Sequence, residues 1–169
     1  MTQAPDLGSL MRRYREIAHG GDAAACREAI AGTTSQEAPF RTEGRFGRHR
    51  VVVDEPSEFG GGDTAANPAE VLFAALGTCL AVTLRCHAAL RGLTLGRITA
   101  ELSGNLDIRG FFDADPAVRS GFQSIAIKLS VESDAPRADL QNLLAAVDRG
   151  CPILDTVRGP TPVTLELAS

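Results

Sequence analysis

The stretch PAEVLFAALGTCLAVTLRCHAAL, residues 68–90, decides the fold that the sequence predicts. It carries little charge and is apolar on most sides, which is typical of a buried central helix. Asn67 suits the N-cap, Pro68 suits the first helical position, and Glu70 can reach back to the cap. A central helix that begins at residue 68 is therefore expected.

Two cysteines on this helix raise the functional question. Cys86 follows Cys79 by seven residues, so both lie on one stripe of a helix. Cys79 is either a small core residue or a nucleophile in a dry pocket, and the helix alone leaves both interpretations open. Cys86 lies about 10 Å from Cys79, too far for a disulfide, and is interpreted as a core residue. His87 is interpreted as a packed or partly exposed histidine.

Composition excludes several classes of function. The chain has 169 residues, of which 44% are hydrophobic, and this is enough for one domain with a core. A net charge of −4 gives no basic surface for nucleic acid. No long uncharged apolar run predicts a membrane span, and the N-terminus does not resemble a signal peptide, so a cytoplasmic protein is expected. The four cysteines lack metal-ligand spacing, and neither a metal nor another cofactor is expected.

The N-terminal 38 residues are predicted to form a helical hairpin that extends the main domain. Apolar residues from Leu7 to Ala18 follow helical spacing, and Gly20-Gly21 ends that helix. A second short helix is expected over residues 23–32, capped by Asp22. A packing arm or part of a dimer contact is the simplest role for this hairpin.

The main domain, residues 39–169, reads as alternating strands and helices. A β-hairpin is predicted over residues 40–56 with its turn near Gly47, and a glycine-rich loop of about a dozen residues follows. Strands are predicted within 97–110 and 122–133, helices over 135–150 and 151–159, and a closing strand over 162–169. The longer of these helices is expected to end at Gly150 and to turn four residues inward: Leu140, Leu143, Leu144 and Val147. This order predicts an α+β fold.

Cys151 occupies a second position with chemical potential. It lies directly after Gly150 and directly before Pro152, which suits the first position of a helix. Cys151 would then be the N-cap, where backbone amides favour a thiolate. The alternative is a cysteine that is merely tolerated at a turn.

The motif N-P-x-E-x-L-x-A-A-L-G-x-C (residues 67–79), followed some 70 residues later by Cys151-Pro152, resembles the OsmC/Ohr family of thiol-dependent peroxidases. The resemblance covers about Phe40 to Leu167. It implies an intertwined homodimer in which two antiparallel sheets wrap central helices. It also implies a peroxidase that reduces organic hydroperoxides, with hydrogen peroxide as a further candidate substrate. A dithiol such as a lipoyl group is expected to return the oxidised enzyme to its reduced form.

The same resemblance assigns roles to individual residues. Cys79 is expected to attack the peroxide and Cys151 to resolve the sulfenic acid as a disulfide. A glutamate at the helix start, matching Glu70, and an arginine of the hairpin, Arg41 or Arg45, are expected to orient the thiolate. Glu70 stands nine residues before Cys79, on the opposite side of a straight helix and about 13 Å away along its axis. A partner chain, or a break at residue 77, would be needed to bring them together.

Two other functions remain open at this stage. A non-catalytic dimer could keep the fold and both thiols as a redox sensor or a binder of apolar ligands. Residues 1–38 could also be a docking arm for a partner.

Overall fold

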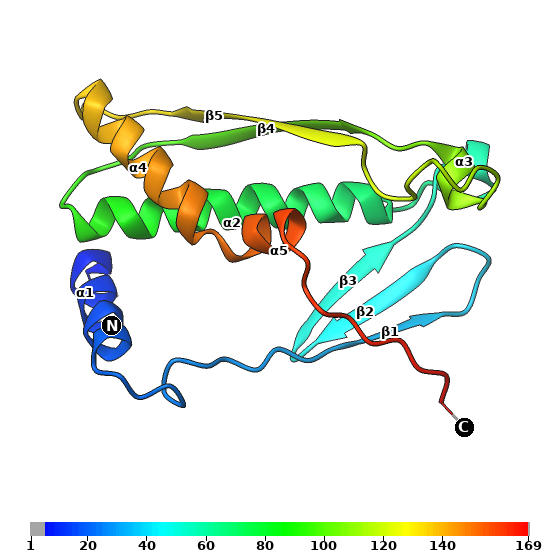
Figure 1. Ribbon diagram of the computed structural model, residues 1–169, viewed down its shortest axis with the longest axis horizontal. Helices are drawn as coiled ribbons and strands as arrows, with labels where there is room; N and C mark the ends of the chain where they lie inside the picture. Colours follow the sequence, from blue (N-terminus) through cyan, green and yellow to red (C-terminus); the bar gives the residue numbers. More distant parts are fainter. Residues whose placement is uncertain (1–5, 169) are drawn as a thin grey trace. The chain divides into compact units, whose positions relative to one another are not determined.

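A computed structural model describes residues 6–168, and the chain divides into two compact units, one ending at Leu76 and the other beginning at Gly77. The helix α2 (Pro68–Leu90) runs from the first unit into the second. Within residues 6–168 the elements run from α1 to α5 and from β1 to β5, and the strands form a three-stranded and a two-stranded antiparallel sheet. Figure 1 labels these elements along the ribbon. The predicted α+β class is confirmed.

The first helix forms where the sequence predicts it, but the second N-terminal helix does not form. Helix α1 (Leu7–His19) begins at Asp6, whose carboxylate accepts the Ser9 N–H at 2.9 Å, and ends at Gly20. Residues 23–26 form only a turn, and β1 (Thr33–Gln36) follows them. A short helix needs a buried apolar face to persist, and Ile30 is 84% exposed. The prediction of a helical hairpin is therefore wrong, whereas the division of the chain at residue 38 stays a prediction.

The β-hairpin of the first unit is confirmed. Strands β2 (Thr42–Phe46) and β3 (His49–Val53) pair antiparallel, and the two-residue turn places Gly47 at φ 58°, a conformation that favours glycine. Strand β1 pairs with the other edge of β2, giving the order β1-β2-β3. A short 3₁₀ helix, η1 (Ser57–Phe59), opens the glycine-rich loop that leads to α2.

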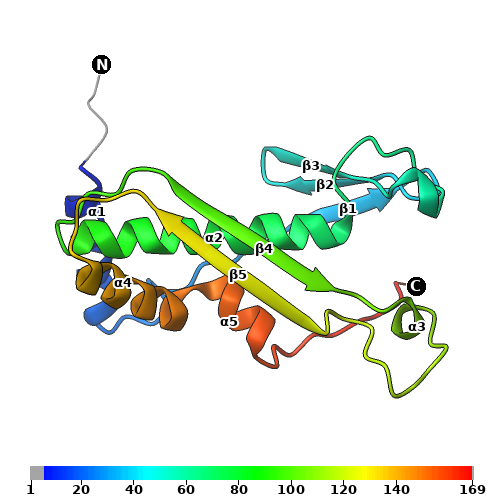
Figure 2. The ribbon, with the colours of Figure 1, turned by 90° about the horizontal axis from the view of Figure 1, so that it is seen from above.

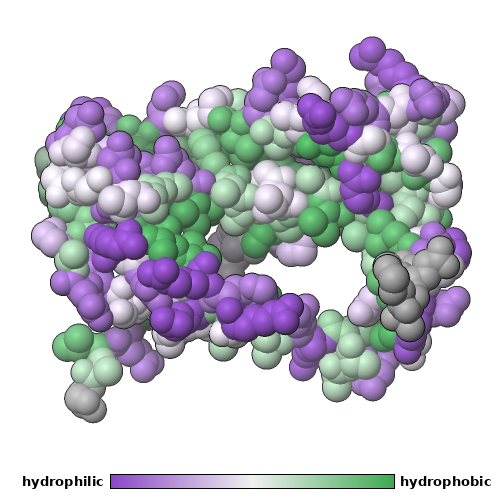
Figure 3. Space-filling view, turned by 180° about the vertical axis from the view of Figure 1, so that it is seen from behind, coloured by the Kyte–Doolittle hydropathy of each residue, from purple (hydrophilic) through white to green (hydrophobic). Residues whose placement is uncertain are grey.

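Helix α2 begins with the predicted capping box and runs without interruption to Leu90. Its buried stripe recurs every four residues and comprises Leu76, Leu80, Leu84 and Ala88. On another face Val82 is 62% exposed. Figure 3 shows apolar residues, in green, among the hydrophilic ones on one surface of the molecule. By length and composition alone, α2 could cross a membrane. Its apolar stretch of 18 residues has a mean hydropathy of 1.6, and 28% of that stretch is buried. The core helix of a globular protein passes the same test.

The second unit contains the predicted pair of long strands. Strands β4 (Ile98–Asn105) and β5 (Ser124–Val131) pair antiparallel over their whole length, and burial alternates along both of them. The short helix α3 (Ile108–Phe111) lies in their connection. The pair runs along the part of α2 that starts at Gly77, as Figure 2 shows, and a Cβ at Gly77 would lie 3.1 Å from Leu102 of β4. Glycine at this position therefore permits the close approach of helix and sheet.

Two helices complete the second unit, and two details of their prediction are wrong. Helix α4 (Arg137–Gly150) buries Leu143 and Val147, but Leu144, predicted to face inward, is 51% exposed. Gly150 lies within α4, and the helix is capped by Cys151 in extended geometry, so no left-handed glycine ends it. Helix α5 (Pro152–Arg158) follows at once, with proline at the predicted first position.

The predicted closing strand is absent from the described part of the tail. Residues 160–168 form no strand, and Val163, Leu165 and Leu167 are 85%, 98% and 99% exposed. Their alternation with polar residues has the period of a strand, but a strand also requires a neighbouring edge to receive its backbone hydrogen bonds. Within residues 6–168 the tail pairs with no such edge.

Two adjacent leucines on α4 provide a direct test of the packing in the second unit. Leu143 is 0% exposed, so we expect Leu143→Ala to lower the free energy of unfolding by about 2–5 kcal/mol, through lost burial and the cavity left behind. Leu144→Ala is the matched control and should cost less than about 1 kcal/mol, because that side chain is half exposed already. Urea unfolding measures both, and equal losses would contradict this arrangement of α4.

Candidate functional site

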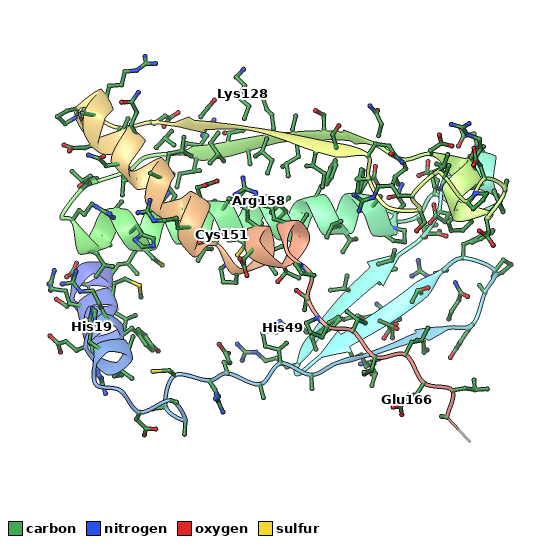
Figure 4. The ribbon with its side chains drawn as sticks, viewed as in Figure 1. His19, His49, Lys128, Cys151, Arg158 and Glu166 are labelled. Atoms are coloured by element: carbon green, nitrogen blue, oxygen red, sulfur yellow. The ribbon has the colours of Figure 1, made fainter. Side chains whose placement is uncertain are left out.

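The structure brings together two cysteines that lie 72 positions apart in the sequence, Cys79 and Cys151. Cys151 lies at the junction of α4 and α5, where Figure 4 labels it, and its backbone N–H donates to the Val147 carbonyl at 3.0 Å. Cys79 projects from α2 and is close enough for its side chain to hydrogen-bond to Cys151. Both are free thiols. The two sulfur-bearing groups that the motif singles out therefore share one site within the second unit.

Burial dominates the electrostatics of Cys151. The residue is 1% exposed, and burial raises the pKa of its thiol above the ordinary cysteine value. The nearby Leu154 N–H lowers that pKa, although the sulfur does not accept an aligned capping hydrogen bond; the side chain of Cys79 raises it, and the Thr83 hydroxyl lowers it. The predicted N-cap position is confirmed, but its preference for a thiolate is outweighed by the loss of solvent.

The face of α2 that carries Cys79 continues toward the junction of α4 and α5. Thr83 follows Cys79 by four residues, which places both on one face of the helix, and His87 follows by four more. His87 packs close to Gly150, the residue before Cys151: a Cβ atom added to this glycine would lie 3.3 Å from the His87 Nε2 atom. This row of α2 side chains therefore lies against the chain on both sides of the α4–α5 boundary.

His87 and Cys86 are both partly buried. Burial lowers the pKa of His87 below its ordinary value, and the charges of Arg91 and Arg149 lower it further, which favours the neutral imidazole. Burial raises the pKa of the Cys86 thiol, so this cysteine stays protonated near neutral pH. Both placements agree with the interpretation of these residues as packed side chains.

Glu70 forms the capping box. Its side chain accepts the Asn67 N–H at 2.8 Å, and its own N–H donates to the Asn67 side chain at 2.9 Å. Because α2 is continuous from Pro68 to Leu90, no break at Gly77 shortens the path from Glu70 to Cys79. Along one helix the two residues therefore stay about 13 Å apart.

The two candidate arginines have different partners. Arg41 donates from Nη1 to the Thr64 hydroxyl at 2.7 Å, and this uses one of the five donors of a guanidinium. Arg45 pairs with Glu43 at 2.6 Å, and Arg50 pairs with the other oxygen of Glu43 at 2.5 Å. The hydrogen bond from Arg50, and then the charges of Arg50, Arg45 and Arg41, lower the pKa of Glu43.

Asp54 organises the glycine-rich loop, and sequence reasoning did not single it out. The residue is 2% exposed and accepts four hydrogen bonds: from the Thr64 hydroxyl at 2.7 Å, and from the N–H groups of Glu55, Gly62 and Thr64 at 2.9, 3.4 and 3.2 Å. These bonds, the Thr64 hydroxyl foremost, lower the pKa of Asp54 to about 2. Thr64 thereby links the buried carboxylate to Arg41.

An apolar pocket adjoins the segment that carries Cys151. Its volume is about 190 Å³, and an apolar cavity of about 150 Å³ is large enough to hold benzene. Arg158 and Asp148 also line it, and they pair at 2.7 Å. The apolar lining comprises Leu80, Ile127, Leu129, Leu144, Val147 and Leu154. Leu80 follows Cys79 on α2, but consecutive residues of a helix point about 100° apart, and neither Cys79 nor Cys151 is among the residues that line the pocket.

No group of three or more histidine, cysteine, aspartate or glutamate side chains with the arrangement of a metal site occurs within residues 6–168.

The α+β fold, with two antiparallel sheets packed on helices, is the fold of OsmC-like proteins. The profile of the family described as OsmC-like protein matches residues 60–166, and the chain belongs to this family. No curated protein matches the sequence.

Solved structures of OsmC and Ohr proteins share the fold. An OsmC-like protein from Mycoplasma pneumoniae is 14% identical with a TM-score of 0.69, and the match covers 79% of this chain and 89% of that one. A putative organic hydroperoxide resistance protein from Vibrio cholerae, with captopril bound in one active site, is 18% identical with a TM-score of 0.57 over 79% and 86%. An organic hydroperoxide resistance protein from Elizabethkingia anophelis is 21% identical with a TM-score of 0.55 over 79% and 91%.

The low pKa of Asp54 predicts an acid-sensitive loop. A carboxylate whose folded pKa is depressed to about 2, from 3.8, stabilises the fold fully above about pH 4 and loses this contribution as the pH falls toward 2. We expect Asp54→Asn to unfold at lower urea concentration than the wild type at pH 6, and the difference to shrink as the pH approaches 2.

The control for this experiment is Asp134→Asn, at an exposed position. Asp107, whose pKa is also lowered to about 2 by its hydrogen bonds with Arg109, contributes equally to all three proteins and cancels in the differences. A gap between Asp54→Asn and the wild type that stays constant from pH 6 to pH 2 would contradict the charged, hydrogen-bonded state of Asp54.

Proposed function

We propose that the protein is a thiol peroxidase that reduces organic hydroperoxides. The observation that carries the proposal is the meeting of Cys79 and Cys151 in one site of an OsmC-like fold. In the first step the Cys79 thiolate attacks the peroxide oxygen: Cys79–S⁻ + ROOH + H⁺ gives Cys79–SOH + ROH. In the second, the Cys151 thiol displaces water from the sulfenic acid and forms the disulfide. A dithiol then reduces the disulfide and is itself oxidised.

The different environments of the two thiols support this order of steps. Cys151 is buried with a raised pKa, so it stays a protonated thiol and is poorly suited to attack peroxide first. Cys79 is half-buried, and a peroxide can reach it more readily. The apolar pocket beside the Cys151 segment is large enough for a small alkyl group, and we propose that it receives the organic part of the hydroperoxide.

We propose Arg41 rather than Arg45 as the arginine that assists Cys79. Arg41 is connected through Thr64 to the buried Asp54, so its position is coupled to the loop that leads into α2. Arg45 shares the Glu43 carboxylate with Arg50, and its side chain is 70% exposed. Glu70 acts in the cap of α2 within its own chain, and a contact with a thiolate would have to involve the partner of a dimer.

We also propose that the protein is a homodimer. Helix α2 is strongly apolar, yet only 28% of its apolar stretch of 18 residues is buried within one chain. The tail that follows α5, where Figure 4 labels Glu166, carries three exposed apolar residues with the period of a strand. A second copy that covers α2 would bury its apolar surface. A strand edge supplied by that copy would pair with the backbone N–H and C=O groups of the tail.

The peroxidase proposal predicts distinct outcomes for the two cysteines. With cumene hydroperoxide and a dithiol, the wild type should consume peroxide, and Cys79→Ser should lose at least a hundredfold in rate because the attacking sulfur is gone. Cys151→Ser should still oxidise once and then accumulate sulfenic or sulfinic acid at Cys79, measured by mass spectrometry. Cys86→Ser is the control and should stay active.

Full activity of Cys79→Ser would exclude Cys79 as the attacking group. A wild-type protein that does not consume peroxide would instead favour the non-catalytic dimer that senses redox state or binds apolar ligands.

The tail provides a test of the dimer. Leu165→Asp should weaken association at least tenfold, because a charge replaces an apolar side chain on the face expected to be buried. Thr164→Asp, on the opposite face of the same segment, is the matched control. This variant should remain a dimer, with the same mass in solution as the wild type. Light scattering during size-exclusion chromatography measures both, and a wild-type protein of monomeric mass would refute the proposal.

A further inference from the structure

The α2 face between Cys79 and His87 holds a polar group that the two-cysteine reaction leaves without a role. Thr83 is half-buried, and its hydroxyl is close enough to hydrogen-bond to the Cys151 sulfur. One turn earlier on the same face, Cys79 also contacts Cys151, and one turn later His87 lies against Gly150. Along this face of α2, the hydroxyl therefore lies between two side chains that are close to the α4–α5 junction.

We propose that Thr83 is a positioning residue for Cys151: its hydroxyl holds the Cys151 sulfur toward Cys79 and stabilises the negative charge that forms on this sulfur as the disulfide closes. The inference rests on the proposed peroxidase function for its biological role. Its chemical content, attack of the Cys151 sulfur on an oxidised Cys79, is independent of which oxidant acts.

The energetics explain why a single hydroxyl matters here. When the disulfide closes, the Cys151 thiol must give up its proton while its sulfur bonds to the Cys79 sulfur and hydroxide leaves as water. A thiol that is 1% exposed has no water to support the developing charge. A hydrogen bond to the charged form replaces part of that solvation, and about one such bond corresponds to roughly a tenfold change in rate. Because the interaction of Thr83 is with Cys151, its effect is expected on the second step.

The chain offers a matched set of variants. Thr83→Val removes the hydroxyl and keeps the branched shape, and Thr83→Ser keeps the hydroxyl and removes the methyl group. Thr156→Val is the control, because the Thr156 hydroxyl lies on α5 but donates to the Pro152 carbonyl at 2.9 Å. All proteins carry Cys26→Ser and Cys86→Ala, so that only the two site cysteines can react.

The first experiment uses one equivalent of cumene hydroperoxide without reductant, quenched at intervals and analysed by mass spectrometry with a sulfenic-acid trap. We expect Thr83→Val to form the sulfenic acid at the wild-type rate and to close the disulfide about tenfold more slowly, with more sulfinic acid at excess peroxide. Thr83→Ser should close within about twofold of the wild type. Closure of Thr83→Val at the wild-type rate, or of Thr83→Ser as slowly as Thr83→Val, would overturn the proposal.

The second experiment separates this inference from the peroxidase function. An aromatic disulfide reagent converts Cys79 to a mixed disulfide, and attack by Cys151 then releases a second equivalent of the coloured aromatic thiol: Cys79–S–S–Ar + HS–Cys151 gives the Cys79–Cys151 disulfide + ArSH. The release should again be about tenfold slower in Thr83→Val and restored in Thr83→Ser. If peroxide fails to oxidise Cys79 but this pattern appears, the peroxidase proposal is wrong and the role of Thr83 stands. If release is equal in all variants, the role of Thr83 is wrong.

Discussion

The rest of the site depends on the burial of the Cys151 thiol against α2. Three helices meet at this residue: α4 ends there, α5 begins there, and the Cys79 face of α2 contacts it. Burial at this junction sets the chemistry of the thiol. Removal from water raises the pKa of the Cys151 thiol by more than the hydrogen bonds from the adjacent amide and hydroxyl lower it. The same burial keeps the sulfur from most solutes and leaves Cys79 as its available partner. Two thiols of one type thus acquire different properties from their surroundings alone.

Local sequence signals predicted most of the fold. The capping box at Asn67 and Glu70, the glycine turn at Gly47 and the proline of α5 each act within a few residues, so their consequences can be worked out from sequence alone. The errors occur where a segment depends on distant surfaces. Residues 23–32 have helical composition but no buried face, and the tail has strand periodicity but pairs with no edge among residues 6–168.

The site shows the same division between local and distant information. The motif indicated both cysteines, although periodicity alone could not place Cys151 beside Cys79. Asp54 lies in a valine-rich strand-to-loop sequence that offered no sign of a buried carboxylate, since its partner Thr64 is ten residues away. Thr83 carried one usable signal, because a polar residue four positions after a candidate nucleophile lies on the same helical face. That spacing identifies the face, but only the packed position of α4 and α5 shows that Cys151 lies there.

The capping role of Glu70 and the continuity of α2 together constrain any mechanism. A carboxylate held in a capping box at the helix start cannot also reach a thiol two and a half turns along the same helix. If a glutamate assists Cys79, it has to approach from outside the helix that carries the cysteine. In the proposed homodimer, the partly exposed apolar surface of α2 is available to pack against the second copy, and such a glutamate would come from the partner chain. The distance along one helix therefore excludes Glu70 of the same helix as the group that assists Cys79.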